Sequence, residues 1–292
     1  MNGVQTSGYL FDKELIDFLV ESEFHISVTI DGPADVHNFN RPAPKKKPSL
    51  QRVLATRDYI VEKQGSCGAI ATVTKGNLGH EAEILDFYRS LGIRYFHSNP
   101  YIYCDAHRVR DKAIALTNEE YASYFIRQFN AWFGGGSESP TPLILEYILA
   151  TAAAGGSPHG ALCAFGGSCL TNYVTIVPNG DAYPCARLAG MSNMRLGNIR
   201  ESPLRDILSA ESPQMRNLIE DRLVALNDCE RQDCPHLSLC NGGCPYYSFV
   251  ASGGKNIRSR DWACEGKTMV FDYLTGIVSD MKAHQGSTQS TL

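Results

Sequence analysis

The sequence predicts an α/β fold with a parallel sheet, followed by a cysteine-rich region. Over the first 116 residues, apolar strand-like segments alternate with amphipathic helical segments. Each of these segments is bounded by turn or capping residues. Eight of the ten cysteines fall after residue 160. Alternation of strand and helix implies a parallel sheet with helices on its outside.

Four short segments have the apolar, β-branched composition of buried strands, and the second ends at the turn sequence Asp31-Gly32-Pro33. The predicted strands are Val4–Thr6, His25–Ile30, Ala69–Thr74 and Tyr95–Ser98. Helical periodicity fills the intervals, with Asp12, Ser49 and Asn118 as predicted N-caps and Gly65 as a helix end. The helix after Asn118 has an aromatic stripe typical of a core face. Its members are Tyr121, Tyr124, Phe125, Phe129 and Trp132.

A β-hairpin is predicted within the cysteine-rich region. The alternating strand Tyr173–Val177 leads into the turn Pro178-Asn179-Gly180-Asp181, and a return strand delivers Cys185. Cys169 precedes the first strand, so the hairpin is expected to bring these two thiols together. Further on, Ser202 and Ser212 each precede a proline, which is a favourable start for a helix. A C-terminal helix is expected after Cys264.

Length, charge and hydropathy limit the expected binding partners and the expected location of the protein. The chain has 292 residues and a formal net charge of −4, so charge gives no case for nucleic acid or membrane binding. No apolar stretch approaches the roughly 20 residues that span a bilayer, and the N-terminus lacks signal-peptide features. A cytoplasmic location is therefore expected. Cytoplasmic thiols stay reduced, which favours metal ligation over disulfides.

The clustered cysteines are sufficient for two sites of four thiolates each. They are Cys163, Cys169, Cys185, Cys229, Cys234, Cys240, Cys244 and Cys264. Zinc held by the four cysteines between 229 and 244 is one interpretation, and iron–sulfur clusters are the other. The pure sulfur donor set favours iron–sulfur. Gly166, Gly167 and Ser168 would let the backbone wrap closely around a cluster. Cys67 and Cys104 are isolated and are predicted to be core thiols.

The spacing of the clustered cysteines resembles that of a known family. The cysteines from Cys169 onward, with Val177-Pro-Asn-Gly-Asp-Ala-Tyr-Pro-Cys185 and Leu196-Gly-Asn-Ile199, resemble the SPASM domain of radical S-adenosylmethionine (SAM) enzymes. Cys163 matches an extra ligand of the sulfatase-maturase-like branch. The interval from Cys229 to Cys234 has four intervening residues where the family usually has two. The resemblance implies two auxiliary [4Fe–4S] clusters. Their ligands would be Cys163, Cys169, Cys185 and Cys244 for the first, and Cys229, Cys234, Cys240 and Cys264 for the second.

The N-terminal half resembles the later strands of an incomplete radical SAM partial (β/α)6 barrel. By this analogy Thr29 and Arg41 would contact SAM, the guanidinium of Arg41 pairing with its carboxylate. An ordinary ion pair is the other interpretation of Arg41. The resemblance implies barrel residues 1–116, a helical connection over 117–160 and a SPASM domain over 161–292.

The family's CX3CX2C motif is absent from this sequence. That motif binds the cluster that cleaves SAM, so the chain looks N-terminally truncated and is expected to be inactive in SAM cleavage by itself. SAM and a third [4Fe–4S] cluster would belong to a full-length form.

The resemblance implies a radical SAM oxidoreductase that modifies a peptide or protein side chain. Its expected partners are a peptide or protein substrate and an electron donor such as flavodoxin or ferredoxin, with no nucleic acid and no membrane. Sulfatase maturases have an acid after the cysteine that ends the hairpin, and this chain has Ala186. Another peptide modification, such as crosslinking, is therefore favoured. The alternative is a stand-alone iron–sulfur or zinc module for electron transfer or peptide docking.

Overall fold

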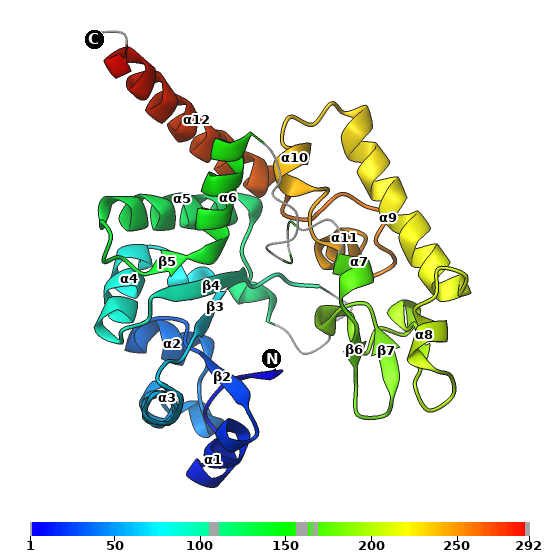
Figure 1. Ribbon diagram of the computed structural model, residues 1–292, viewed down its shortest axis with the longest axis horizontal. Coiled ribbons are helices and arrows are strands. Elements are labelled where there is room, and N and C mark those ends of the chain that lie inside the picture. The colour runs from blue at the N-terminus through cyan, green and yellow to red at the C-terminus, as the bar shows by residue number, and fades with distance from the viewer. Residues whose placement is uncertain (1, 105–110, 156–162, 164, 166–168, 290–292) are drawn as a thin grey trace. The chain divides into compact units, whose positions relative to one another are not determined.

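A computed structural model describes residues 2–104, 111–155, 163, 165 and 169–289, with side chains through residue 284. The chain divides into two compact units (Figure 1). The first unit comprises Met1–Tyr101 and Lys112–Glu146, and the second comprises Ile102–Asp111 and Tyr147–Leu292. The predicted boundaries at residues 116 and 160 remain predictions. None of the described helices is long and apolar enough to cross a membrane.

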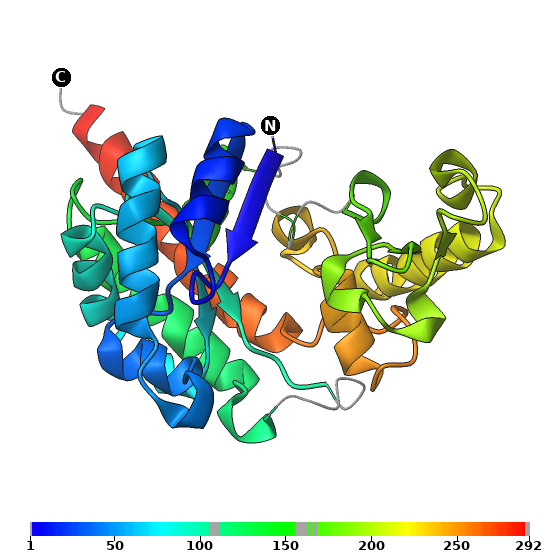
Figure 2. The ribbon, with the colours of Figure 1, turned by 90° about the horizontal axis from the view of Figure 1, so that it is seen from below.

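The first unit is built on a parallel sheet, as predicted, but the sheet has five strands where four were predicted, because β5 was not expected. The strands lie in the order β1-β2-β3-β4-β5, and every neighbouring pair is parallel. Their bounds are β1 Asn2–Thr6, β2 Phe24–Thr29, β3 Ala69–Val73, β4 Tyr95–Pro100 and β5 Thr141–Pro142. The sheet has β1, the dark blue arrow in Figure 2, at its edge. All carboxyl ends therefore point the same way, which is where such sheets bind ligands.

Helices connect successive strands of this unit. They are α1 Lys13–Glu21, α2 Ala34–Asn40, α3 Leu50–Gln64, α4 Glu81–Ser90 and α5 Asn118–Gly134, with α6 Leu143–Ala154 running on into the second unit. Apolar side chains of α1, α3 and α4 pack on β2, β3 and β4 to form the core, which includes Ile16, Val53, Ile84 and Tyr88. The stripe on α5 is buried at Tyr121, Tyr124, Phe125 and Phe129, as predicted, while Trp132 is half-buried.

Two predicted caps are wrong, and a third, Ser49, is confirmed in position but makes no capping hydrogen bond. Thr117, not Asn118, caps α5, because its hydroxyl accepts from the N–H of Glu120, whose carboxylate in turn accepts from the N–H of Thr117. Ser49 occupies the cap position of α3, but its hydroxyl donates to the carbonyl of Arg41. Neighbouring groups thus compete for short polar side chains at helix starts.

The second wrong cap is Ser202, since Pro203 is the N-cap of the short helix that follows. Two other predicted caps are confirmed. Asp12 accepts from the N–H of Leu15 at the start of α1. Ser212 accepts from the N–H of Met215, with Pro213 as the first helical residue. Ser202 and Ser212 both precede a proline, but only Ser212 is the N-cap of its helix.

The second unit contains the predicted hairpin and a set of helices around it. Its strands are β6 Thr175–Ile176, β7 Asp181–Tyr183 and β8 Gly197–Asn198, paired antiparallel in that order. Its helices are α7 Cys169–Asn172, α8 Leu204–Ile207, α9 Pro213–Arg231, α10 Leu237–Cys240, α11 Pro245–Ala251 and α12 Cys264–Gln289. Gly180 turns the hairpin with φ +91°, where its missing Cβ would meet the side chain of Asn198. The predicted hairpin and C-terminal helix are thus confirmed, while β8 was not predicted as a strand.

Candidate functional site

The structure brings the first predicted set of cysteines together in the second unit. Cys169 begins α7, Cys185 follows β7, and Cys244 is the N-cap of α11. These three thiols and Cys163 are close enough for charge on one to affect the others. The hairpin therefore does what the sequence suggested and places Cys185 beside Cys169. Gly166, Gly167 and Ser168, predicted to wrap this site, lie outside the described residues.

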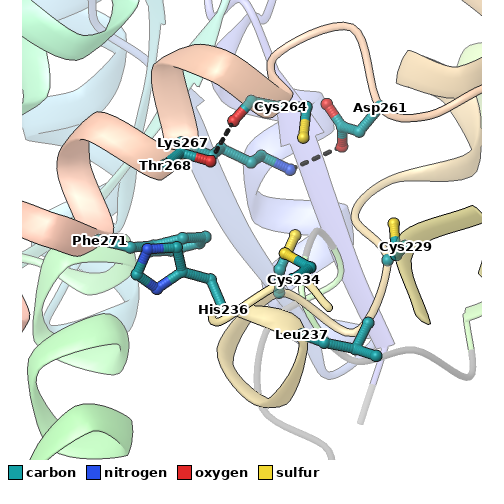
Figure 3. Close-up of a pocket in the computed structure, with 11 residues that line it drawn as sticks. Cys229, Cys234, His236, Leu237, Asp261, Cys264, Lys267, Thr268 and Phe271 are labelled. Carbon is teal, nitrogen blue, oxygen red and sulfur yellow. Dashed lines mark hydrogen bonds and ion pairs between the residues drawn. The ribbon is translucent and has the colours of Figure 1, made fainter. Parts of the chain in front are cut away.

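The second predicted set lines one pocket (Figure 3). Cys229 lies near the end of α9, Cys234 and Cys240 flank a short turn and α10, and Cys264 begins α12. All four cysteines line the pocket together with His236, Asp261, Lys267 and Phe271. Cys229, whose spacing to Cys234 is unusual, is buried and lies close enough to Cys264 for their charges to interact. The longer interval does not remove Cys229 from the pocket.

A tight loop from Cys240 to Cys244 links the two sets, because its first cysteine belongs to the second set and its last to the first. The loop contains Gly242 and Gly243, both with φ +73°. Only glycine adopts this region at little cost. A Cβ on Gly242 would lie 3.0 Å from a guanidinium nitrogen of Arg222, and one on Gly243 would lie 2.7 Å from Cβ of Asp261. The glycines therefore let two charged side chains reach the loop backbone.

Arg222 fixes the shape of this loop from α9. The residue is 5 % exposed. Its Nη1 donates to the carbonyl of Gly242 at 2.9 Å, and its Nη2 donates to those of Asn241 at 2.7 Å and Gly243 at 3.0 Å. Three consecutive carbonyls thus share one guanidinium fork. The carbonyls of the loop thus point toward this cation, while the N–H of Gly243 donates to the carbonyl of Cys240 and the N–H of Cys244 donates to Asp261.

Burial disfavours the ionised form of several of these thiols and therefore raises their pKa values. It raises the pKa of Cys169 and of Cys240 to about 12 and that of Cys244 to about 11. Nearby cations act in the opposite direction. Arg187 lowers the pKa of Cys244, and Arg260 donates from Nη2 to Sγ of Cys264 at 2.9 Å. Such cations offset the negative charge that thiolate ligands bring into a buried site.

The donor set fits iron–sulfur clusters. Zinc requires four sulfurs at about 2.3 Å from one ion. A four-iron cluster spaces its thiolates further apart, because each sulfur binds a different iron. Two groups of four thiols, with cations around them, suit that requirement.

Thr29 and Arg41, predicted to contact SAM, lie in the first unit near the carboxyl ends of its strands. Thr29 ends β2, and its hydroxyl accepts from the side-chain amide of Gln5 at 3.2 Å. Arg41 ends α2 and is already paired, since its Nε donates to Oδ2 of buried Asp31 and its Nη2 donates to Oγ1 of Thr72, both at 2.7 Å. A role for these residues toward SAM stays a prediction.

His37 packs beneath this ion pair and is fully buried. Its Nδ1 accepts from the N–H of Asp31 at 3.2 Å, which requires the neutral ring. Burial, with the charge of Arg41, lowers the pKa of His37 to about 4. The unfolded chain, with a His pKa of about 6.5, takes up the proton first as pH falls. Stability contributed by neutral His37 is therefore complete above about pH 6.5 and is lost toward pH 4.

We expect this histidine to make the protein acid-sensitive. Between pH 7 and pH 5 the wild type should lose about 2 kcal/mol more unfolding free energy than His37→Asn, which keeps an acceptor near the Nδ1 position. Urea unfolding at the two pH values measures both. Burial raises the pKa of Asp31, an opposite effect that both proteins share, so it cancels in the comparison. Equal pH dependence of the two proteins would contradict the assignment.

Comparison with known proteins shows which domain family the cysteine-rich part matches. Residues 163–245 match the family described as SPASM, an iron–sulfur cluster-binding domain. This part of the chain is a SPASM domain. The match begins at Cys163 and ends one residue after Cys244, and the predicted bounds of 161–292 extend beyond it.

Curated relatives of the chain are anaerobic sulfatase-maturating enzymes. A cysteine-type enzyme from Clostridium perfringens is 23% identical over 248 residues, which are 83% of this chain and 64% of the relative. A serine-type enzyme from Bacteroides thetaiotaomicron is 22% identical over 298 residues, covering 96% of this chain and 69% of the relative. The chain thus spans about two thirds of the length of these relatives. Together with the SPASM domain, they confirm the predicted resemblance to radical SAM/SPASM maturases.

The fold is confirmed by a solved structure. Native anSMEcpe with bound AdoMet and Cp18Cys peptide aligns with a TM-score of 0.77 at 19% identity. The alignment covers 96% of this chain and 76% of that chain. The predicted α/β fold, a radical SAM partial barrel followed by a SPASM domain, is therefore correct.

Several residues of the site were missed by sequence reasoning. They are Arg187, Arg222, Arg260, Asp261 and Lys267. Lys267 follows Cys264 by three residues, which places both on one helix face, so helical spacing from a predicted ligand could have found it. Arg222 lies far from the loop in sequence, and no local pattern connects the two.

Proposed function

We propose that this chain is a member of the radical SAM/SPASM peptide or protein maturases and that it does not cleave SAM by itself, because its sequence holds no CX3CX2C motif. In this proposal the SPASM domain binds two auxiliary [4Fe–4S] clusters. The first would be held by Cys163, Cys169, Cys185 and Cys244, and the second by Cys229, Cys234, Cys240 and Cys264. The observation that carries the proposal is the convergence of these eight cysteines into two groups of four.

When bound, such clusters supply one-electron transfer or a position for binding substrate. Residues of this chain prepare both sites by holding the ligand loop through Arg222 and by placing cations near the thiols. In a full-length form, Thr29 and Arg41 would contact SAM, with Asp31 orienting the guanidinium of Arg41. SAM cleavage would require a third [4Fe–4S] cluster on a CX3CX2C segment outside this sequence.

The proposed substrate is a peptide or protein side chain. A bound peptide in the similar anSMEcpe structure supports this class. Ala186 stands where sulfatase maturases have an acid, which supports a different peptide modification. An electron donor such as flavodoxin or ferredoxin would supply the reducing equivalents. A cytoplasmic location would keep the thiols reduced for cluster assembly.

Anaerobic reconstitution tests both the metal assignment and the expected lack of SAM cleavage by this chain. The purified chain is expected to take up about eight iron and eight sulfide per molecule, two clusters' worth. With SAM and dithionite it is expected to form no 5′-deoxyadenosine, because no cysteine motif for the SAM-cleaving cluster is present in the sequence. Metal analysis and chromatography of the products measure both.

Other outcomes of the same experiment would contradict the proposal. Zinc at one or two per chain would support the alternative, a stand-alone zinc module, and would overturn the cluster proposal. Clear formation of 5′-deoxyadenosine would overturn the proposal that this chain does not cleave SAM by itself. Two clusters without any SAM cleavage, even after addition of a CX3CX2C-bearing segment, would favour an electron-transfer or peptide-docking module instead.

A further inference from the structure

A buried ion pair lies beside the proposed cluster ligands. Nζ of Lys267 is 2.7 Å from Oδ2 of Asp261, and the side chains are 2 % and 3 % exposed. The ammonium also lies over the rings of Phe165, at 4.8 Å, and Tyr247, at 5.3 Å from their centroids. Charges removed from water act strongly on their surroundings and are little screened by salt. This pair is therefore a fixed source of electrostatic potential in the SPASM domain.

The pair is tied to the first ligand set through its carboxylate. Oδ2 of Asp261 accepts from the N–H of Cys244 at 2.7 Å, and Oδ1 accepts from the N–H of Ala263 at 2.7 Å. Asp261 is consequently fixed against a ligand of the first set.

The cation is oriented toward the second ligand set. Lys267 lies one helical turn after Cys264 on α12 and lines the pocket that holds the four cysteines of that set (Figure 3). Asp261 also lines this pocket, but its Oδ2 accepts a hydrogen bond from the N–H of Cys244, a residue of the first set. The dipole of the pair thus has its positive end toward the second set and its negative end toward the first.

We propose that the Lys267–Asp261 pair raises the reduction potential of the cluster in the second set relative to that in the first. The inference rests on the proposed function, in which both sets hold [4Fe–4S] clusters. A nearby positive charge favours the added electron, and a nearby negative charge disfavours it. The pair therefore favours residence of an electron on the second cluster over the first.

Lys267→Met tests the proposal, because it removes the charge and keeps an unbranched apolar side chain against Phe165 and Tyr247. The potential of the second cluster should fall relative to the first by about 59 mV, a tenfold change in the one-electron equilibrium between them. This direction holds whether or not Asp261 then binds a proton. Lys267→Arg keeps the charge and should keep the difference. Anaerobic redox titration followed by electron paramagnetic resonance measures both potentials.

The two signals can be assigned with Arg260→Gln. Arg260 contacts Cys264 of the second set, so the signal whose potential falls most in this variant belongs to the second cluster. Lys267→Gln, which is neutral but can hydrogen-bond to Asp261, repeats the test if Lys267→Met retains less iron than the wild type.

The outcomes separate this inference from the proposed function. An unchanged potential difference in an iron-replete neutral variant overturns the inference and leaves the cluster proposal intact. Loss of iron in both neutral variants but not in Lys267→Arg would show that the pair serves folding, and would also overturn it. A wild type that binds zinc, or fewer than two clusters, overturns the proposed function itself.

Discussion

Gly243→Ala should deprive the SPASM domain of iron at both proposed sites. The new Cβ would lie 2.7 Å from Cβ and 2.8 Å from Cγ of Asp261, at a backbone φ of +73° that disfavours side chains. Either the loop or Asp261 has to move. Because Cys240 and Cys244 end this loop, movement displaces one ligand of each set. Iron and sulfide analysis after anaerobic reconstitution should show less than half the wild-type content.

Gly253→Ala is the matched control for this change. Gly253 has nearly the same backbone conformation, φ +69°, but a Cβ there would meet nothing within 4 Å. This variant carries the backbone strain of about 1–2 kcal/mol without the clash, and it should bind iron like the wild type. Full iron content in Gly243→Ala would show that the contact with Asp261 is dispensable for both sites.

Arg222→Met should destabilise the protein by about 3 kcal/mol or more. The substitution leaves the buried carbonyls of Asn241, Gly242 and Gly243 without their shared donor. Hydrogen bonds from a charged donor contribute about 1.5–3 kcal/mol each, although the three share one side chain and do not add fully. Urea unfolding of the reconstituted protein under anaerobic conditions measures the loss.

Arg216→Met on the same helix is the appropriate comparison. Arg216 is exposed, and its guanidinium donates only a 3.4 Å hydrogen bond to the carbonyl of Glu211. Its replacement should change stability by no more than about 0.5 kcal/mol. Arg222→Lys keeps the charge but loses the planar fork, so it should fall between the two. If both methionine variants unfold at the same urea concentration, Arg222 does not stabilise the loop.

Local sequence patterns were sufficient for the parallel sheet and the hairpin. The strands of the first unit are short apolar runs closed by turn residues, and the turn at Gly180 carries its own conformational signal. Cap assignment was less accurate, since Thr117 and Asn118 are both good caps and only the position of Glu120 decides between them. Cys67 and Cys104 are buried, as expected for isolated core thiols.

The surroundings of the cysteines could not be predicted in the same way. Arg222 and Asp261 contact the ligand loop from two separate segments, which are α9 and the turn before α12. Such contacts depend on tertiary packing and leave no periodic trace in the sequence. The pairing of Arg41 with Asp31 is similar, because it joins the end of α2 to the end of a strand ten residues earlier.

Each proposed ligand set combines cysteines that lie far apart in the sequence, and this order affects when a cluster can be inserted during synthesis. The matched domain begins at Cys163 and ends just after Cys244, yet these two residues belong to one proposed ligand set. The other set is incomplete until Cys264 has been added. A ribosome must therefore release nearly the whole domain before either site has all four donors. Cluster insertion would then be a late step in the synthesis of this chain, because neither proposed site has its full ligand set before that moment.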